Sequence, residues 1–190
     1  MKKRQLGIHY NAPVVLSFAL LSLVVLGLDF LTGGATTTKF FCVYRSSFSD
    51  PLTYVRLFGH VLGHSGYSHY ISNIMLMLGV GTTLEDKYGS KKLMFCILIT
   101  ALVSGLVQMF LFPSTALLGA SGIVFMMIVL ASLSGMKNNS IPLTLILVVI
   151  LYLGGELWDA ITVRDSVSQL THIVGGACGA VLGLTIGGRR

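Results

Sequence analysis

Long apolar segments separated by short polar ones fill most of the chain. They predict six membrane spans, at residues 13–31, 68–84, 93–112, 117–135, 141–155 and 167–187. A helix needs about 20 predominantly apolar residues, range about 17–25, to cross the hydrocarbon core of a bilayer. The second and fifth segments are short for this, so we expect them to be tilted, extended into the interface or shielded by neighbouring helices. The pattern predicts an all-α polytopic membrane protein with a bundle of six transmembrane helices.

The composition is far from that of a soluble domain. Of the 190 residues, 54% are hydrophobic and only 11% are charged, and the mean hydropathy is +0.83. Such values are typical of a membrane protein, and the length suits one domain. The net charge of +6 is divided among short clusters between the apolar segments. We therefore interpret it as a determinant of membrane topology and expect no nucleic-acid partner.

Lysine and arginine are divided unevenly between the two sides of the predicted bundle. With the N-terminus inside, nine lie inside (Lys2, Lys3, Arg4, Lys87, Lys91, Lys92, Lys137, Arg189 and Arg190) and four outside (Lys39, Arg45, Arg56 and Arg164). The positive-inside rule then places both termini in the cytoplasm. The predicted organisation is a short cytoplasmic N-terminus at 1–12, a six-helix domain at 13–187 and a short cytoplasmic C-terminal end at 188–190.

The first apolar segment has a second interpretation, a cleaved signal peptide. The basic residues of Met1–Arg4 precede it, and the small residues of Gly33–Ala35 follow it. Its apolar stretch is long for the hydrophobic region of a signal peptide. We therefore expect a retained helix.

Residues 32–67 form the longest segment outside the predicted spans, a long outer first loop. The segment is rich in aromatic side chains, namely Phe40, Phe41, Tyr44, Phe48, Tyr54 and Phe58. Aromatic rings are favoured at the membrane–water interface. We expect this loop to lie partly in the outer interface rather than in bulk water.

Three histidines and an asparagine follow at regular spacing. His60 and His64 are four residues apart, as are His69 and Asn73 at the start of the second predicted span. Histidine clusters bind metal ions, but the H-E-x-x-H pattern is absent and no carboxylate lies between positions 50 and 85, so we expect no metal and no cofactor. For His60 and His64 we favour internal hydrogen bonds that hold the loop to the helix. For His69 and Asn73 we favour hydrogen bonds donated to a developing oxyanion.

The segment Leu117–Phe125 has the sequence L-L-G-A-S-G-I-V-F and opens the fourth predicted span. Ser121 lies between Gly119 and Gly122, where the missing side chains allow backbone or substrate to approach closely. If a helix begins here, its first N–H groups have no partner within the helix. The segment offers a candidate nucleophile beside candidate oxyanion donors. Small residues that only pack helices together are the alternative interpretation.

Glycines recur at every fourth position of the sixth predicted span, at Gly175, Gly179, Gly183 and Gly187. They give the helix one face of bare backbone, which allows very close approach to a neighbour. His172 lies on nearly the same face, so it can reach Ser121 if that neighbour is the fourth span. Neutral imidazole can activate a serine near pH 7. No obvious aspartate orients this histidine, so we expect a Ser–His dyad, with Phe125 stacked on the imidazole.

These motifs together resemble the rhomboid family of intramembrane serine proteases, over about residues 56–187. The shared features are six spans, H-x3-H-x4-H-x3-N leading into the second, G-A-S-G opening the fourth and a histidine before G-x3-G in the sixth. The resemblance implies that the nucleophile is Ser121, the general base is His172, and the oxyanion hole consists of His69, Asn73 and the backbone N–H of Ser121. It assigns structural support to Arg56, His60, His64, Glu85, Gly119, Gly122, Phe125, Gly175 and Gly179.

The chain departs from the family pattern at four positions. Val55 stands where tryptophan is usual, Ser72 where a bulky phenylalanine is common, Phe125 where tyrosine is frequent and Thr171 where alanine is usual. None of these changes removes a catalytic group, so we do not interpret the chain as an inactive relative. We expect Ser72 to alter the substrate entrance, and Phe125 to keep a ring contact without the hydroxyl.

The resemblance implies a serine endopeptidase that cleaves transmembrane segments of membrane proteins near the outer face. Its partners are then transmembrane protein substrates and the lipid bilayer, and the compact form suits a bacterial plasma membrane; the sequence defines no oligomeric state. A non-catalytic rhomboid-like protein that binds or guides transmembrane clients is one alternative, against which intact Ser121 and His172 argue. A small transporter is another, but its polar residues would line both leaflets, whereas here they concentrate toward the outer half.

Overall fold

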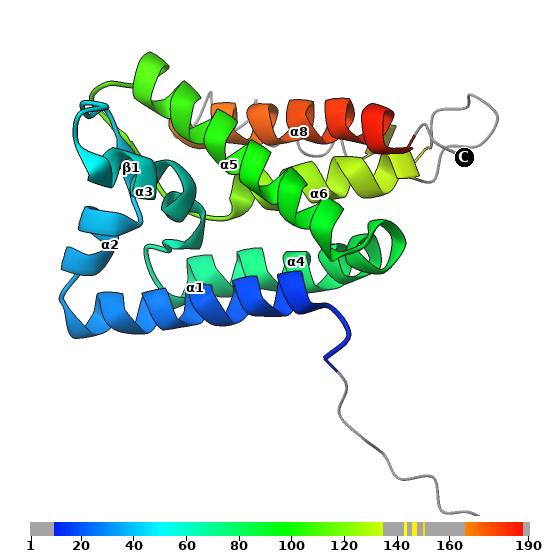
Figure 1. Cartoon of the computed structure of the whole chain (residues 1–190), viewed down its shortest axis with the longest axis horizontal. Coiled ribbons are helices and arrows are strands. Elements are labelled where there is room, and N and C mark those ends of the chain that lie inside the picture. The colour runs from blue at the N-terminus through cyan, green and yellow to red at the C-terminus, as the bar shows by residue number, and fades with distance from the viewer. Residues whose placement is uncertain (1–9, 135–142, 144–145, 148–149, 151–165, 188–190) are drawn as a thin grey trace, which may run out of the picture.

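Five long helices make up most of the described structure (Figure 1). The computed structural model describes residues 10–134, 143, 146–147, 150 and 166–187. The long helices are α1 (Pro13–Leu31), α4 (Tyr67–Tyr88), α5 (Ser90–Leu111), α6 (Ser121–Ser134) and α8 (Ser166–Gly187). They correspond to the first, second, third, fourth and sixth predicted spans. The fifth predicted span, at 141–155, lies mostly outside the described residues.

Two of these helices, α1 and α5, are long and apolar enough to cross a bilayer, whereas α6 and residues 170–186 of α8 are apolar but shorter. The outward positions of the helices carry large exposed apolar side chains, among them Leu21 on α1, Met75 on α4, Phe95 on α5 and Val181 on α8. Extended apolar surface of this kind is typical of contact with lipid. The fold is therefore mostly helical and membrane-like, and the count of six spans stays a prediction.

The helix α6 lies at the centre and packs against α4, α5 and α8. Its residues 122–127 are all buried, so the helix is covered on every side. At Gly81 of α4, an added Cβ would lie 2.9 Å from Cγ2 of Val15 on α1 and 3.1 Å from the sulfur of Met127 on α6. Lipid tails are as apolar as these side chains, so close van der Waals contact, more than exclusion of water, holds such helices together.

The boundary between α4 and α5 differs from the predicted one. The second span was predicted at 68–84 and short, but α4 has 22 residues and continues to Tyr88. Residues 85–92, which separate the second and third predicted spans, are also helical except for Gly89, which has a φ of 82° and joins α4 to α5. The charged residues of this segment lie within the last turn of α4 and the first turn of α5.

The carboxylate of Glu85 is buried inside α4, and hydrogen bonds from α1 and α5 satisfy both of its oxygens. Its Oε1 accepts hydrogen bonds from the N–H of Val14 at 2.9 Å and from the hydroxyl of Ser90 at 2.7 Å, and its Oε2 accepts from the N–H of Val15 at 3.0 Å. Val14 and Val15 lie in the first turn of α1, where N–H groups have no partner within the helix. Glu85 therefore caps α1 from a distant part of the chain, and the negative charge suits the positive end of the helix dipole.

The start of α6 also differs from the prediction. The fourth span was predicted to begin at residue 117, but Leu117 belongs to the short strand β2 (Ala116–Leu117), and the helix begins at Ser121. Strand β2 pairs antiparallel with β1 (Val43–Tyr44), with Val43 opposite Leu117. Gly119 follows with a φ of 119°, a conformation that ends any regular helix or strand. The apolar side chain of Leu117 is buried in a cluster with Val43, Leu57 and Met109, and its apolar character is compatible with a buried strand as well as with the start of a span.

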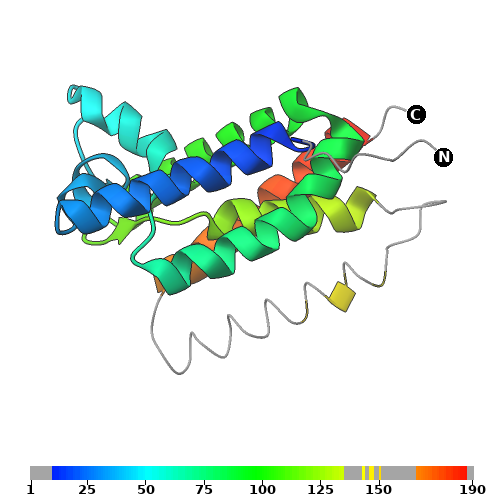
Figure 2. The same cartoon turned by 90° about the horizontal axis from the view of Figure 1, so that it is seen from below.

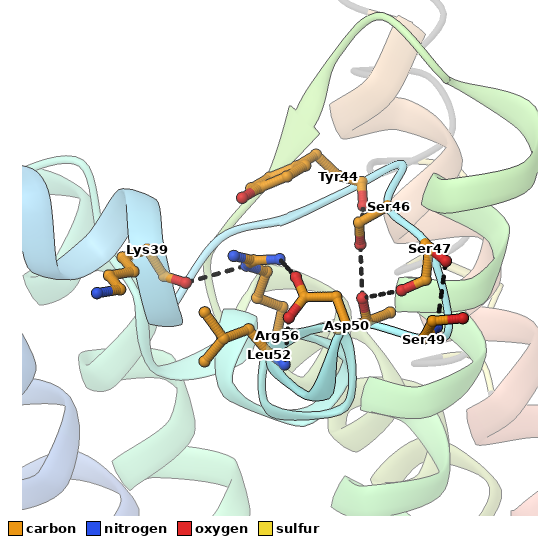
Figure 3. A network of polar contacts seen from close by, with 9 residues as sticks. Lys39, Tyr44, Ser46, Ser47, Ser49, Asp50, Leu52 and Arg56 are labelled. Carbon is orange, nitrogen blue, oxygen red and sulfur yellow. Dashed lines mark hydrogen bonds and ion pairs between the residues drawn. The ribbon is translucent and has the colours of Figure 1, made fainter.

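Two short helices, a strand and a 3-10 turn connect α1 to α4: α2 (Ala35–Phe40), β1, α3 (Pro51–Gly59) and η1 (His60–Leu62). Arg56 ties them together (Figure 3). Its Nε donates to the carbonyl of Lys39 at 2.9 Å, one of its terminal nitrogens pairs with Asp50 at 3.1 Å, and its guanidinium lies 4.6 Å from the ring centroid of Tyr44. Asp50 in turn caps α3 by accepting from the N–H of Leu52 at 2.9 Å. The predicted outer loop is thus an ordered segment.

The two ends of the bundle carry different structures. The views in Figures 1 and 2 show the segment of α2, β1 and α3 at one end of α1, and the junction of α4 and α5 at the other end. At the second end, Nζ of Lys87 donates to the carbonyl of Ser134, the last residue of α6, at 2.5 Å. Helix α6 therefore runs from the end with the ordered loop toward the end with the lysines, and its first residue faces the former.

Candidate active site

Ser121 is the first residue of α6 and is half-buried. The N–H of Val124 donates to the carbonyl of Ala120 at 2.9 Å, so the N–H groups of Ser121 and Gly122 come before the regular hydrogen bonds of the helix. These groups point toward the end of the helix at which Ser121 lies. The local backbone therefore places a hydroxyl and free helical N–H donors at one point.

The loop that enters α6 is fixed by a backbone contact from η1. The N–H of Gly119 donates to the carbonyl of His60 at 2.9 Å. Gly119 adopts a φ of 119°, which a residue with a side chain rarely adopts. This hydrogen bond joins two segments almost 60 positions apart and fixes the residues just before Ser121.

His69, on the first turn of α4, lies against Gly119. A Cβ added to Gly119 would lie 2.8 Å from both Cε1 and Nε2 of the His69 ring. On the other edge of the ring, the N–H of Ser65 approaches Nδ1 at 3.4 Å and the hydroxyl of Ser65 lies at 3.1 Å. Because a backbone N–H can only donate, Nδ1 is the acceptor and the proton of the neutral ring is on Nε2. The Nε2–H donor therefore faces the loop two residues before Ser121.

Asn73 lies one turn further along α4 and is buried. Its Nδ2 donates to the carbonyl of His69 at 3.1 Å. A side-chain amide has two N–H donors, so the second remains available for a ligand near the same face of α4. His69 and Asn73 thus present two donors from adjacent turns of one helix.

His60 and His64 both hydrogen-bond to backbone. Nδ1 of His60 lies 3.1 Å from the carbonyl oxygens of Arg56 and of Leu57, so it carries the proton, and Nδ1 of His64 lies 3.1 Å from the carbonyl of Leu62. Burial is the main cause that lowers the pKa of each ring to about 4. Both rings are therefore neutral at physiological pH, and they hold η1 and the following loop in place.

The ring of His64 supports His69. The two ring centroids are 5.0 Å apart in an edge-on arrangement, and the ring of Tyr70 lies 5.6 Å from His64 on another side. His64 has no solvent exposure. A buried, neutral His64 therefore restricts the positions that the His69 ring can take.

The glycines of α8 bring it into contact with the backbone of α6. A Cβ on Gly175 would collide with the carbonyl group of Gly122, and one on Gly179 would lie 2.5 Å from the carbonyl oxygen of Met126. In the opposite direction, a Cβ added to Gly122 of α6 would lie 3.0 Å from Cγ2 of Thr171 on α8. The sixth predicted span thus packs on the fourth through its glycine face, as the spacing indicated.

His172 lies in the part of α8 that contacts the first turn of α6. Thr171 before it and Gly175 after it both abut Gly122, the residue that follows Ser121. Its ring centroid lies 6.1 Å from that of Phe125, with the planes tilted by 41°. The ring contact predicted for Phe125 is therefore present as a tilted pair rather than a face-to-face stack, a geometry that aromatic rings favour.

The other predicted residues lie outside this centre. Arg56 is in the ordered loop, and Glu85 is about 18 Å along α4 from Asn73, at 1.5 Å per residue. Of the four departures from the family pattern, Val55 and Ser72 are exposed, whereas Phe125 and Thr171 are buried between α6 and α8. Within the described residues, no group of three or more histidine, cysteine, aspartate and glutamate side chains is placed to hold a metal ion.

Ser65 is a site residue that the sequence analysis missed. Its backbone N–H sets the tautomer of His69 by donating to Nδ1, and its hydroxyl contacts the same atom. Ser65 precedes His69 by four residues, a spacing that brings side chains together within a helix. Ser65 lies in the turn before α4, however, where this spacing alone predicts no contact.

Comparison with known proteins identifies the family of the chain. The family model of the Rhomboid domain matches residues 51–189, and the chain belongs to the rhomboid family. It is similar to the Rhomboid protease GluP of Bacillus subtilis (strain 168), with 25% identity over 96% of this chain and 38% of the relative, and to Rhomboid-related protein 1 of Caenorhabditis elegans, with 27% identity over 69% of this chain and 39% of the relative. The chain therefore spans about two-fifths of the length of these relatives.

Proposed function

We propose that the chain is a serine endopeptidase that cleaves transmembrane segments of membrane proteins. The observation that supports the proposal is that two histidines contact residues close to Ser121 in the sequence. His69 of α4 abuts Gly119, two residues before it, and His172 of α8 contacts Phe125, four residues after it. A nucleophile needs a base on one side and donors for the oxyanion on the other, and this arrangement offers both.

In the proposed reaction, Oγ of Ser121 attacks the carbonyl carbon of the scissile peptide while a ring nitrogen of His172 takes the hydroxyl proton. The carbonyl oxygen becomes an oxyanion, and its donors are the N–H of Ser121, Nε2–H of His69 and Nδ2–H of Asn73. The intermediate collapses when His172 gives its proton to the leaving nitrogen, which leaves an acyl-enzyme on Ser121. Water then attacks the ester with His172 again as the base, and the second product leaves with a free carboxyl group.

The tautomer of His69 supports this assignment of donors. An oxyanion donor has to present N–H toward the substrate, and the acceptor role of Nδ1 toward Ser65 leaves the proton on Nε2. A His69 with the opposite tautomer would present a lone pair to the oxyanion and repel it. Removing a single oxyanion donor costs about 10²–10³ in kcat in well-studied hydrolases.

We infer that the reaction takes place toward the outer side of the membrane. Ser121 begins α6 at the helix end that faces the ordered loop, whereas Lys87, Lys91 and Lys92 lie at the opposite end of the bundle. Positive residues favour the cytoplasmic side. With both termini in the cytoplasm, a transmembrane substrate would meet Ser121 after unwinding locally near the outer face.

The proposal is tested by cleavage of a transmembrane reporter protein in proteoliposomes. Ser121→Ala and His172→Ala are each expected to lower the rate at least about 10³-fold, whereas Ser132→Ala, a serine later in the same helix whose hydroxyl bonds to the carbonyl of Ile128, is expected to retain it. Cleavage that survives Ser121→Ala would refute the nucleophile. Association with the reporter but no cleavage by the unaltered chain would favour a binding protein that guides membrane clients.

A further inference from the structure

A cavity of about 350 Å³ lies between the first turn of α5 and the last turn of α8. Lys91, Lys92 and Phe95 of α5 line one side, and Thr185 and Ile186 of α8 line the other. Both elements lie toward the end of the bundle that holds the α4–α5 junction (Figure 1). The cavity is therefore distant from Ser121, and the proposed protease reaction makes no use of it.

Lys91 and Lys92 form no salt bridge with any of the described residues. Lys91 and Lys92 are exposed, and the described part of the chain has a single salt bridge, which lies in the ordered loop at the other end. The nearby carboxylate of Glu85 is occupied by the N–H groups of α1 and by Ser90. Positive side chains in the first turn of a helix also oppose the helix dipole. Two adjacent cations thus remain available for an anion.

The wall beyond the lysines is apolar. On α5, Phe95 and Leu98 are exposed one and two turns after the lysines, and on α8, Val181 and Leu184 are exposed before Thr185. By their positions in the sequence, Leu98 on α5 and Val181 on α8 lie about one turn nearer the middle of their helices than Phe95 and Thr185, which line the cavity. A cationic pocket at the end of an apolar strip matches a phospholipid, with its phosphate at the pocket and its acyl chain along the strip.

Thr185 narrows the class of headgroup. Its hydroxyl donates to the carbonyl of Val181 at 2.9 Å and lies 3.1 Å from that of Leu182. With its proton used in this way, the oxygen of Thr185 offers only lone pairs to a ligand. An acceptor beside two lysines suits a headgroup that combines a phosphate with a hydroxyl group.

We propose that this cavity is a binding site for an anionic phospholipid, with the phosphate held by Lys91 and Lys92 and one acyl chain packed on Phe95. The probe of choice is dioleoyl phosphatidylglycerol, which carries both a phosphate and hydroxyl groups. Dioleoyl phosphatidylcholine is its matched comparison, because it has the same acyl chains but no net charge.

The test is native mass spectrometry of the full chain released from detergent micelles, titrated with each lipid. The unaltered chain is expected to bind phosphatidylglycerol more tightly than phosphatidylcholine. The double variant Lys91→Gln, Lys92→Gln is expected to weaken phosphatidylglycerol binding about thirtyfold, since each basic residue near an anionic surface contributes about 1 kcal/mol. The control Lys39→Gln, Arg45→Gln removes the same charge at the other end of the bundle and is expected to leave binding within about twofold, because that end lies beyond the range of screened charge.

Three results would overturn the proposal. Equal affinity of the unaltered chain for the two lipids would show that the charge of the headgroup is not recognised, and this comparison needs no variant to fold. Equal weakening in both double variants would assign the effect to net charge rather than to the cavity. Displacement of the lipid by millimolar inorganic phosphate would identify a site for free anions instead of a lipid site.

Discussion

Substitution of Gly119 by alanine tests whether the loop before α6 positions His69. The new Cβ would lie 2.8 Å from both Cε1 and Nε2 of the ring, whereas ordinary van der Waals contact begins near 3.4 Å. The ring must therefore move by more than half an ångström, or the loop must move instead. The φ of 119° adds backbone strain of about 1–3 kcal/mol for a residue with a side chain.

Either movement separates Nε2 of His69 from the place where the oxyanion would form. We expect Gly119→Ala to lower kcat for a transmembrane reporter about 10²–10³-fold, the loss typical of one oxyanion donor. Thermal unfolding in detergent is expected to show a loss of stability of only about 1–3 kcal/mol, so the protein stays folded at the assay temperature.

The matched control is Gly34→Ala, in the turn between α1 and α2. Gly34 has a φ of 90°, and nothing lies within 4 Å of a Cβ added there. It therefore carries backbone strain of the same kind without a collision near Ser121. We expect wild-type kcat from this variant with a similar loss of stability. Wild-type kcat in Gly119→Ala, or an equal loss of kcat in both variants, would refute the role of the loop.

Three further predictions address the support of the site. Glu85→Gln is expected to destabilise the protein by about 1–3 kcal/mol in thermal unfolding, because an NH2 donor replaces one of the two carboxylate oxygens, each of which accepts from one N–H group of α1. The exposed Asp86→Asn is expected to change little, and equal effects would contradict the cap. The pKa of about 4 for His60 lies below its usual value, so the unfolded chain binds a proton at higher pH than the folded chain does. The stability from neutral His60 is therefore full above pH about 6.5 and falls by about 3 kcal/mol toward pH about 4. This dependence of stability on pH should be weaker in His60→Gln. Ser65→Ala is expected to lower kcat about fivefold, with unchanged stability, because the His69 ring loses its hydroxyl contact at Nδ1, worth about 1 kcal/mol, while the backbone N–H of residue 65 still favours the tautomer with the proton on Nε2; Ser65→Thr should restore it.

The apolar pattern predicted the long helices well where a helix faces lipid along its length. The first predicted span, 13–31, coincides with α1. The pattern failed where a polar residue is paired over a long sequence distance. The second predicted span ends just before the charged Glu85, but Glu85 lies inside α4 and accepts hydrogen bonds from N–H groups of α1 about 70 positions away, which no local pattern reveals.

The candidate site, like the fold, was predicted from the sequence only in part. The spacing of the glycines in the sixth span predicted a face for close packing, and α8 packs on α6 through Gly175 and Gly179. The start of α6 was misplaced by four residues because an apolar run is compatible with a buried strand as well as with a helix. The tautomer of His69 required the position of Ser65, which only the folded loop provides.

The central claim, that Ser121 is an activated nucleophile, is tested most directly by labelling. The full chain in detergent is treated with a fluorophosphonate probe, digested and analysed by mass spectrometry to locate the adduct. We predict one modified serine, Ser121, with labelling lost in Ser121→Ala and in His172→Ala but retained in Ser132→Ala. A modified serine other than Ser121, or undiminished labelling of the His172→Ala variant, would contradict the proposed dyad.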